Sequence, residues 1–393
     1  MSRLERPRPS TTRWSGDLMA ESAIKKIELA IRRFYNARAG GNAEPMVVEA
    51  PKVVLDIASL HRVLLLRQDR IGDVLVSTPI ISALRKHLPS ARIDVVLSTN
   101  NIAVRQAIED QVNHIHVFRK SLLHLFILRR ILRQQRYDLV IDMMDNASST
   151  SALLISGARA RWSIGVDKVN RGVYSHVVPL ADQTRVHIVE RIARLLWPLG
   201  ISLQGDDLRL SFPLTADQRQ QAKSLMTDPR GRRVLAVNIS GSDVHRMYPE
   251  EMMARLVQAI AARWCHDGKG GLALRLMSAP MHADMARRIG QACDVEVVPP
   301  QPSYASFAAC IAAADMLLTP DTSAVHAAAA HSVPSVVLFS QDSRGLMPWL
   351  PYATPCWPCI TTAGALETID VADVLNAVEA MIESTTERNS GDA

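Results

Sequence analysis

Short apolar runs alternate with helical stretches along most of this chain, and this alternation constrains the fold more than any other feature. Val63 to Leu66 form an all-apolar run suited to a strand that is buried on both faces. Residues 72–88 then place apolar side chains at helical spacing. Strands that alternate with helices predict a parallel sheet with helices on both faces, so we expect an α/β fold.

A chain of 393 residues is long enough for two domains of ordinary size, and the alternation indeed occurs twice. In the first half, the other predicted strands are residues 93–97, 115–118 and 139–143. After an interruption near residues 205–213, strands are predicted at 234–238, 272–277, 316–319 and 335–339, and helices at 215–226, 249–263 and 322–331. We therefore predict two doubly wound, Rossmann-like domains over residues 59–208 and 209–385. An N-terminal extension (1–58, weakly helical at 23–34) and a flexible tail (386–393) would flank them.

The charge balance favours anionic partners. Lys and Arg number 45 against 39 Asp and Glu, which leaves a formal charge of +6. Aromatic residues make up only 5% of the chain, so platforms on which bases could stack are scarce, and no nucleic-acid-binding motif accompanies the charge. We expect no nucleic acid as partner; an anionic lipid, a phosphorylated glycolipid or a nucleotide sugar fits the balance.

Several features predict a cytoplasmic protein. The first 20 residues contain four arginines but no apolar segment follows them, and no run of apolar residues is long enough to span a bilayer. Five cysteines are too few for a disulfide framework. Cys356 and Cys359 form one close pair, and without further ligands nearby we interpret it as part of a structural loop rather than as a zinc site.

In open α/β sheets, ligands bind beyond the carboxyl ends of the strands, so the loops after the predicted strands are the candidate sites. The first such loop, Arg67 to Val74, has Gly72 where the backbone must turn sharply. It lacks the glycine patterns of dinucleotide-binding and phosphate-binding loops. Asp73 stands at the helix start, where the helix dipole stabilises a carboxylate by about 0.3–1 kcal/mol. On this loop alone, that structural role is favoured.

A second loop follows residues 234–238 and contains Ser240, Gly241 and Ser242, with Arg246 shortly after. Backbone amides, hydroxyl groups and a cation could together hold a phosphate. An ordinary solvated loop before a helix that starts with Pro249 explains the same residues equally well.

The third loop, Pro320 to His326, carries the most specific signal. A buried strand leads into a helix that opens with small polar residues, and free amides at a helix N-terminus suit a diphosphate. Capping by Asp321 or Thr322 explains those two residues. It does not explain His326 in the first turn of a helix that is otherwise rich in alanine.

Together, these loops resemble the lipopolysaccharide heptosyltransferase family in order and separation. The segments that carry the resemblance are Val63 to Arg67, Arg70 to Val74, Thr78-Pro79, Arg246 to Pro249 and Pro320 to His326. The resemblance spans roughly residues 60–345. It implies a GT-B fold, in which two Rossmann-like domains face each other across a cleft, with the acceptor held by the N-terminal domain and the nucleotide sugar by the C-terminal one.

The resemblance also implies an activity: inverting transfer of a heptose from ADP-heptose to a Kdo or heptose residue of an anionic glycolipid, without metal or other cofactor. Asp73 would be the general base, and Arg67 and Arg70 would bind the acceptor. Arg246 and the amides at Thr322 and Ser323 would stabilise the departing diphosphate. The other residues expected to bind the nucleotide sugar are Ser240, Gly241, Ser242, Asp321 and His326.

Other functions fit the same pattern. A transferase with another donor or acceptor would use the same loops, a sugar-nucleotide epimerase would need no acceptor, and a non-catalytic binder would hold the nucleotide sugar without turnover. Residues 119–133 add a question about membranes, because an apolar stripe there has cations at both ends. Such a segment could touch anionic lipid at the inner face of the membrane. A helix that covers the sheet with arginines around a buried stripe is favoured by its position.

Overall fold

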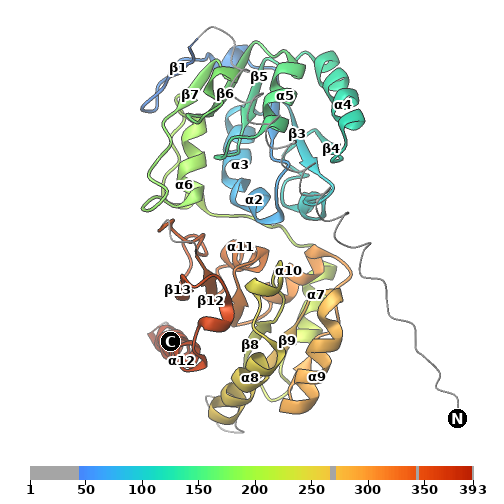
Figure 1. Cartoon of the computed structure of the whole chain (residues 1–393), viewed down its shortest axis with the longest axis vertical. Coiled ribbons are helices and arrows are strands. Elements are labelled where there is room, and N and C mark those ends of the chain that lie inside the picture. Colours follow the sequence, from blue (N-terminus) through green and yellow to red (C-terminus); the bar gives the residue numbers. More distant parts are fainter. Residues whose placement is uncertain (1–43, 266–270, 342–344, 392–393) are drawn as a thin grey trace, which may run out of the picture.

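The computed structural model describes residues 44–265, 271–341 and 345–391. Two α/β domains are stacked along the long axis of the molecule (Figure 1). The first contains a sheet of seven strands in the order β1-β7-β6-β5-β2-β3-β4, and the second a sheet of six in the order β10-β9-β8-β11-β12-β13. All pairings between these strands are parallel, as the sequence predicted.

The elements of the first domain follow the predicted alternation. Its strands are β1 (Met46–Val47), β2 (Arg62–Leu66), β3 (Arg92–Ser98), β4 (His114–Phe118), β5 (Leu139–Asp142), β6 (Trp162–Val166) and β7 (His176–Val178). Its α-helices are α2 (Ile71–Val76), α3 (Thr78–His87), α4 (Leu122–Gln135), α5 (Ser149–Ala158) and α6 (Ile188–Ala193). Short 3₁₀ helices include η2 (Ile102–Ala107) and η5 (Gly205–Leu208), the latter at the exit from the domain.

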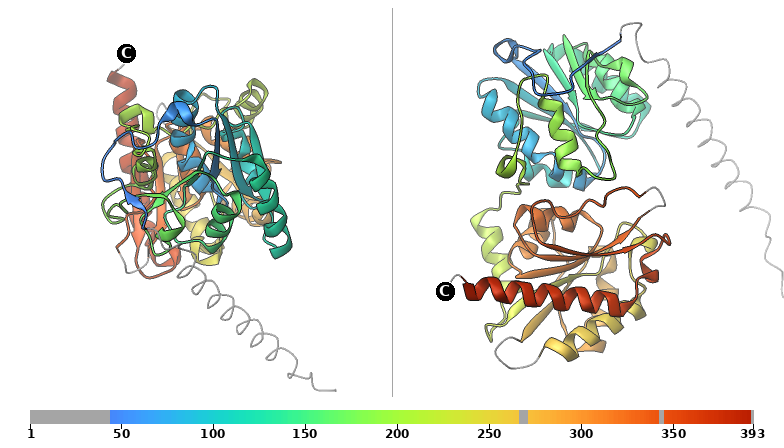
Figure 2. Two further views of the ribbon diagram at one scale, coloured as in Figure 1. Left: turned by 90° about the horizontal axis from the view of Figure 1, so that it is seen from above. Right: turned by 90° about the vertical axis from the view of Figure 1, so that its left-hand side faces the viewer.

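The second domain has the same construction. Its strands are β8 (Arg233–Asn238), β9 (Leu272–Met277), β10 (Glu296–Val297), β11 (Met316–Pro320), β12 (Ser335–Ser340) and β13 (Cys356–Thr361). Its α-helices are α7 (Ala216–Met226), α8 (Glu250–Trp264), α9 (Ala283–Cys293), α10 (Tyr304–Ala312), α11 (Ser323–Ala330) and α12 (Val371–Gly391). The last helix lies across this domain, packed against β13 and α8 (Figure 2).

Alternate residues of the central strands face different helix layers, because side chains alternate between the faces of a sheet. In β2, Leu64 and Leu66 pack in one cluster with side chains of α4 and α5, whereas Val63 and Leu65 belong to the cluster on the opposite face. That second cluster is continuous with side chains of α10 and α11 in the other domain. The two domains therefore meet through buried apolar contacts near the ends of β2 and β11.

Each sheet has a topological switch point, where successive connections leave in opposite directions. It lies between β2 and β5 in the first sheet and between β8 and β11 in the second. Crevices beyond the carboxyl ends of strands at such points are the usual ligand sites of doubly wound sheets. All three candidate loops follow switch-point strands: β2, β8 and β11.

Two expectations about the elements were wrong. The helix predicted over 72–88 is two helices, α2 and α3, joined at Ser77; Pro79, which has no amide hydrogen to donate, sits in the first turn of α3. The segment with Cys356 and Cys359 is strand β13 rather than a loop. It forms the edge of its sheet, and proline is tolerated in edge strands, so Pro358 does not prevent pairing with β12.

The domain limits also differ from those predicted. β1 pairs with β7, and Leu55 and Leu60 are buried, so the first domain includes residues assigned to the N-terminal extension. A two-residue strand has no periodicity to detect, which explains the error. Residues 1–43, with the weakly helical segment, lie outside the described residues. At the other end, α12 continues to Gly391, past the predicted start of the tail at residue 386.

Candidate active site between the two sheets

The loop after β2 touches helix α11 of the other domain. A methyl group built at Gly72 would lie 2.7 Å from Cδ2 and 3.0 Å from Nε2 of the His326 side chain. Glycine is therefore what allows α2 to approach α11 this closely. The contact brings Asp73, at the next position, to the same junction as the start of α11.

Asp73 is held by a buried arginine. The Arg67 guanidinium donates from Nη2 to Oδ1 of Asp73 at 3.2 Å and from Nε to its carbonyl oxygen at 2.7 Å, and Nη1 reaches the carbonyl of Met143 after β5. The amide of Arg70 donates to Oδ2 of Asp73 at 3.1 Å. Asp73 thus has the predicted place at a helix start, and its conformation is fixed from both sides.

Arg67 has a different role from the one predicted. Its side chain is only 2% exposed and its donors point to Asp69, Asp73 and Met143, so the guanidinium positions carboxylates instead of facing an acceptor. Burial alone would lower the pKa of Arg67, but the negative charges of Asp69 and Asp73 outweigh it and raise the pKa. Arg70 is exposed at the start of α2 and stays a candidate for acceptor binding.

Asp69 is a second carboxylate on the same guanidinium, which the sequence reading did not single out. Its Oδ2 accepts from Nη1 of Arg67 at 3.3 Å, whereas Oδ1 is buried with no hydrogen-bond partner among the described residues. Burial raises its pKa to about 7, Arg67 opposes the shift, and Asp73 adds to it. Protonation of Asp69 near neutral pH would therefore change the charge beside Asp73.

Buried ion pairs line the end of β5, on the other side of the switch point. Oδ2 of Asp142 accepts from Nζ of Lys168 at 3.0 Å and from the Tyr174 hydroxyl at 2.6 Å. Asp145 pairs with Nη2 of Arg191 at 2.7 Å. Both carboxylates thus hold the segment after β5 in place. Lys168 and Arg191 gave no local signal, because they come from distant segments.

The loop after β8 is tightly built around Gly241. A methyl group there would lie 1.9 Å from the Arg246 carbonyl oxygen, so only glycine fits. Oγ of Ser240 already accepts from the Ala279 amide at 2.8 Å and contacts Nδ1 of His282 at 2.9 Å. The hydroxyl of Ser240 is thus occupied in holding the next loop, whereas Ser242 is exposed and its hydroxyl donates to Asp243 at 3.0 Å.

Arg246 lies beside the start of α11. Its Nη1 donates to Oδ2 of Asp321 at 2.9 Å, and about a third of its side chain (34%) is exposed. Burial raises the pKa of Asp321, while the charges of Arg246 and Arg70 oppose that shift. Each domain therefore contributes a cation that acts on this carboxylate.

Helix α11 begins as predicted, with Thr322 as its N-cap: Oγ1 accepts from the Ala324 amide at 3.3 Å. Ser323 is the first helical residue, and its carbonyl accepts from the Tyr304 hydroxyl at 2.9 Å. The first turn therefore holds amides that have no partner within the helix, close to Arg246. Such a terminus carries a partial positive charge that suits an anionic ligand.

His326 of the second domain contacts the first domain directly. Its side chain is buried against Gly72 and near Trp349, with 6.1 Å between the ring centroids, and its Nδ1 has no partner among the described residues. Burial is the main cause that lowers its pKa to about 3, with smaller contributions from His187 and from the positive charge of Arg67. A neutral imidazole thus packs between the domains, a role that its sequence position did not reveal.

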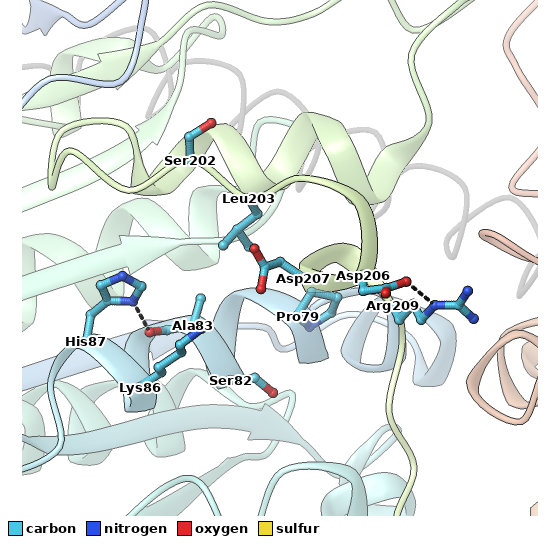
Figure 3. Close-up of a pocket in the computed structure, with 10 residues that line it drawn as sticks. All are labelled: Pro79, Ser82, Ala83, Lys86, His87, Ser202, Leu203, Asp206, Asp207 and Arg209. Carbon is cyan, nitrogen blue, oxygen red and sulfur yellow. Dashed lines mark hydrogen bonds and ion pairs between the residues drawn. The ribbon is translucent and has the colours of Figure 1, made fainter.

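One hollow of about 390 Å³ lies elsewhere, between α3 and the segment around η5 (Figure 3). Its wall combines apolar and polar residues with the charged side chains of Lys86, Asp206, Asp207 and Arg209. None of the predicted site residues lines it. The candidate site is therefore the junction between the loop after β2 and the start of α11.

Comparison with known proteins agrees with this geometry. The model of glycosyltransferase family 9 (heptosyltransferase) matches residues 125–368, more than half of the chain. Lipopolysaccharide heptosyltransferase 3 of Escherichia coli is 25% identical over 345 residues, which covers 80% of this chain and 97% of that protein.

Solved structures share the fold. A family 9 glycosyltransferase from Veillonella parvula superposes with a TM-score of 0.68 at 18% identity, covering 85% of this chain and 100% of that one. The E. coli heptosyltransferase WaaC with ADP-2-deoxy-2-fluoro heptose gives a TM-score of 0.61 at 21% identity, covering 81% and 99%. Both sheets thus belong to a GT-B-like fold, and the predicted fold class is confirmed.

The contact between Gly72 and His326 can be tested by a double-mutant cycle. Gly72→Ala should gain about 1 kcal/mol from helix propensity but lose about 1–3 kcal/mol through overpacking against His326. In a His326→Ala background only the gain should appear. Urea unfolding of the four proteins measures the difference. An equal effect of Gly72→Ala in both backgrounds would mean that the two residues do not touch.

The buried His326 also predicts a pH effect on stability. Its folded pKa of about 3 lies below the ordinary value of 6.5, so the unfolded chain binds the proton first, and stability falls as the pH drops below 6.5. At pH 5.5 the loss from this residue should be about 1 kcal/mol relative to pH 7.5. Thermal unfolding of wild type and His326→Gln at both pH values measures it. Between pH 7.5 and pH 5.5, His326→Gln should lose less stability than the wild type. The control His61→Gln, at an exposed position, should lose as much stability as the wild type.

Proposed function

The chain belongs to glycosyltransferase family 9, and on this premise we propose that it transfers a heptose from ADP-heptose to a Kdo or heptose residue of the lipopolysaccharide inner core. The contact between Gly72 and His326 carries the proposal most directly. It puts the loop with Asp73 against the helix whose N-terminus would hold a diphosphate. An acceptor on the first domain and a donor on the second would then meet at this junction.

Asp73 is the proposed general base. The acceptor hydroxyl attacks the anomeric carbon of the donor sugar from the face opposite the diphosphate, its proton passes to the Asp73 carboxylate, and the bond to the diphosphate breaks with inversion. A carboxylate has about four lone-pair sites, and Arg67 and the Arg70 amide use one on each oxygen. Lone pairs on both oxygens are left for a substrate hydroxyl.

Positive charge for the leaving group comes from the second domain. We assign the diphosphate to Arg246 and to the free amides of Thr322 and Ser323, where the first turn of α11 adds its partial charge. Gly241 lets the backbone of this loop pack closely, and Ser242 is exposed enough to contribute a hydroxyl. An incoming diphosphate would share Arg246 with Asp321, whose raised pKa favours protonation when a second anion arrives.

The donor and the acceptor are proposed from relatives. One relative is named as lipopolysaccharide heptosyltransferase 3, and WaaC was solved with an ADP-heptose analogue. Arg70, exposed beside Asp73, would bind an anionic acceptor. The cytoplasmic face of the inner membrane is where we expect the reaction. Among the described helices, none combines the length and apolar character needed to cross a bilayer.

The assignment of Asp73 is tested by the isosteric variant Asp73→Asn. Its acceptor-dependent ADP release should fall by about 10²–10⁴-fold, because the amide cannot take the acceptor proton. ADP affinity should stay within about twofold, since the side chain lies in the acceptor domain. The assay measures ADP released from ADP-heptose, with and without heptose-deficient Kdo-lipid A.

Asp69→Asn is the matched control, because Asp69 is bound to the same guanidinium. It should keep most of the activity. If Asp69→Asn lost acceptor-dependent ADP release and Asp73→Asn kept it, the general base would be Asp69 instead of Asp73. ADP-heptose binding without release under any acceptor would point to another acceptor or a non-catalytic binder, and conversion of the donor without acceptor would point to an epimerase.

A further inference from the structure

Helix α4 has two apolar stripes, and only one of them is buried. Leu125, Leu128 and Leu132 pack into the cluster on the sheet, which confirms the prediction of a sheet-covering helix. The opposite stripe is exposed: 76% of Leu122, 72% of Leu123 and 62% of Phe126 are accessible, and Ile127 and Ile131 continue the row. Clusters of exposed apolar side chains on a soluble helix usually mark an interaction site.

Basic side chains surround the exposed stripe. Arg119 and Lys120 precede the helix, Arg130 and Arg133 lie near its end, and all four are exposed. None of the four forms an ion pair with a residue in the described ranges. Residues 119–136 contain no Asp or Glu. A helix with an apolar row between cations is complementary to an anionic bilayer, in which acyl chains lie beneath negative headgroups.

The position of α4 relates this surface to the cleft. β4 ends at Phe118 and α4 begins at Leu122, so the most exposed leucines, Leu122 and Leu123, lie within five residues of the carboxyl edge of the first sheet. Loops at that edge contact the second domain, through α2 with α11 and through η2 with α10. Helix α4 runs along the outer side of the first domain (Figure 1). A bilayer on α4 would therefore lie beside the acceptor side of the site.

We propose that the exposed face of α4, formed by Leu122, Leu123, Phe126, Ile127 and Ile131 with the flanking cations, binds an anionic lipid bilayer and holds the acceptor side of the cleft at the membrane surface. A second copy of the chain is a poorer occupant. A symmetric contact through α4 would set the same cations of both copies against each other. The relation to the acceptor rests on the proposed function; lipid binding itself does not.

The test is co-sedimentation of the full chain with phosphatidylcholine vesicles that contain or lack phosphatidylglycerol, without donor or acceptor. Binding should require phosphatidylglycerol and weaken with salt, because charge attraction is screened. The variant Leu122→Ser/Leu123→Ser/Phe126→Ser should bind these vesicles with an affinity lower by roughly tenfold or more. Met281→Ser/Val169→Ser removes equally exposed apolar groups elsewhere and should bind as wild type.

A second variant, Arg130→Glu/Arg133→Glu, keeps the apolar row and should lose the preference for phosphatidylglycerol. Equal binding to both vesicle types, or binding unchanged in the triple serine variant, would overturn the proposal. A dimer in sedimentation velocity that the triple variant abolishes, without vesicle binding, would assign the face to a second copy. Vesicle binding by a protein that releases no ADP would keep this inference and remove the proposed function.

Discussion

Arg67 donates hydrogen bonds to two acidic residues and a carbonyl from the interior of the first domain, and the conformation of the loop with Asp73 depends on this one buried cation. Its bond to the Met143 carbonyl ties the loop after β2 to the end of β5, across the switch point. Removing one partner of a buried ion pair leaves the other uncompensated, typically at a cost of about 3–5 kcal/mol. The position of Asp73 is therefore part of the stability of the domain.

The second domain meets this arrangement through apolar packing rather than charge. His326 is neutral and buried, and it fills the space that a side chain on Gly72 would occupy. Polar contacts support the same junction at its periphery, where Nε2 of His187 contacts the Leu350 carbonyl at 3.0 Å and the Met347 amide donates to the Gln183 carbonyl at 2.9 Å. Two partly or fully exposed cations border this junction: Arg246 from the second domain, which pairs with Asp321, and Arg70 from the first.

Much of the fold could be predicted because its signals are local. The all-apolar run of β2 and the small polar residues before α11 reveal a buried strand and a helix start without any knowledge of their neighbours. Motifs drew attention to Asp73 and Arg246, and the loops that carry them lie at the same junction, but their roles in transfer stay predictions. Short strands such as β1 and β7 were missed, because two or three residues show no period.

Roles that depend on distant contacts were not predictable. Arg67 looked like an acceptor ligand until its side chain was found facing inward, and Lys168 reaches Asp142 from 26 positions away. The exposure of the second apolar stripe of α4 was not predictable for the same reason. Helical spacing shows which residues share a face, but whether a second apolar face is covered depends on what packs there.

The most direct test of the account is a crystal structure with an ADP-heptose analogue and a soluble acceptor fragment. We predict that the diphosphate binds Arg246 and the amides of Thr322 and Ser323, with an acceptor hydroxyl within hydrogen-bonding distance of the Asp73 carboxylate. We also predict that His326 stays in contact with Gly72. A diphosphate bound away from α11, or an acceptor hydroxyl that approaches a group other than Asp73, would contradict the central claim.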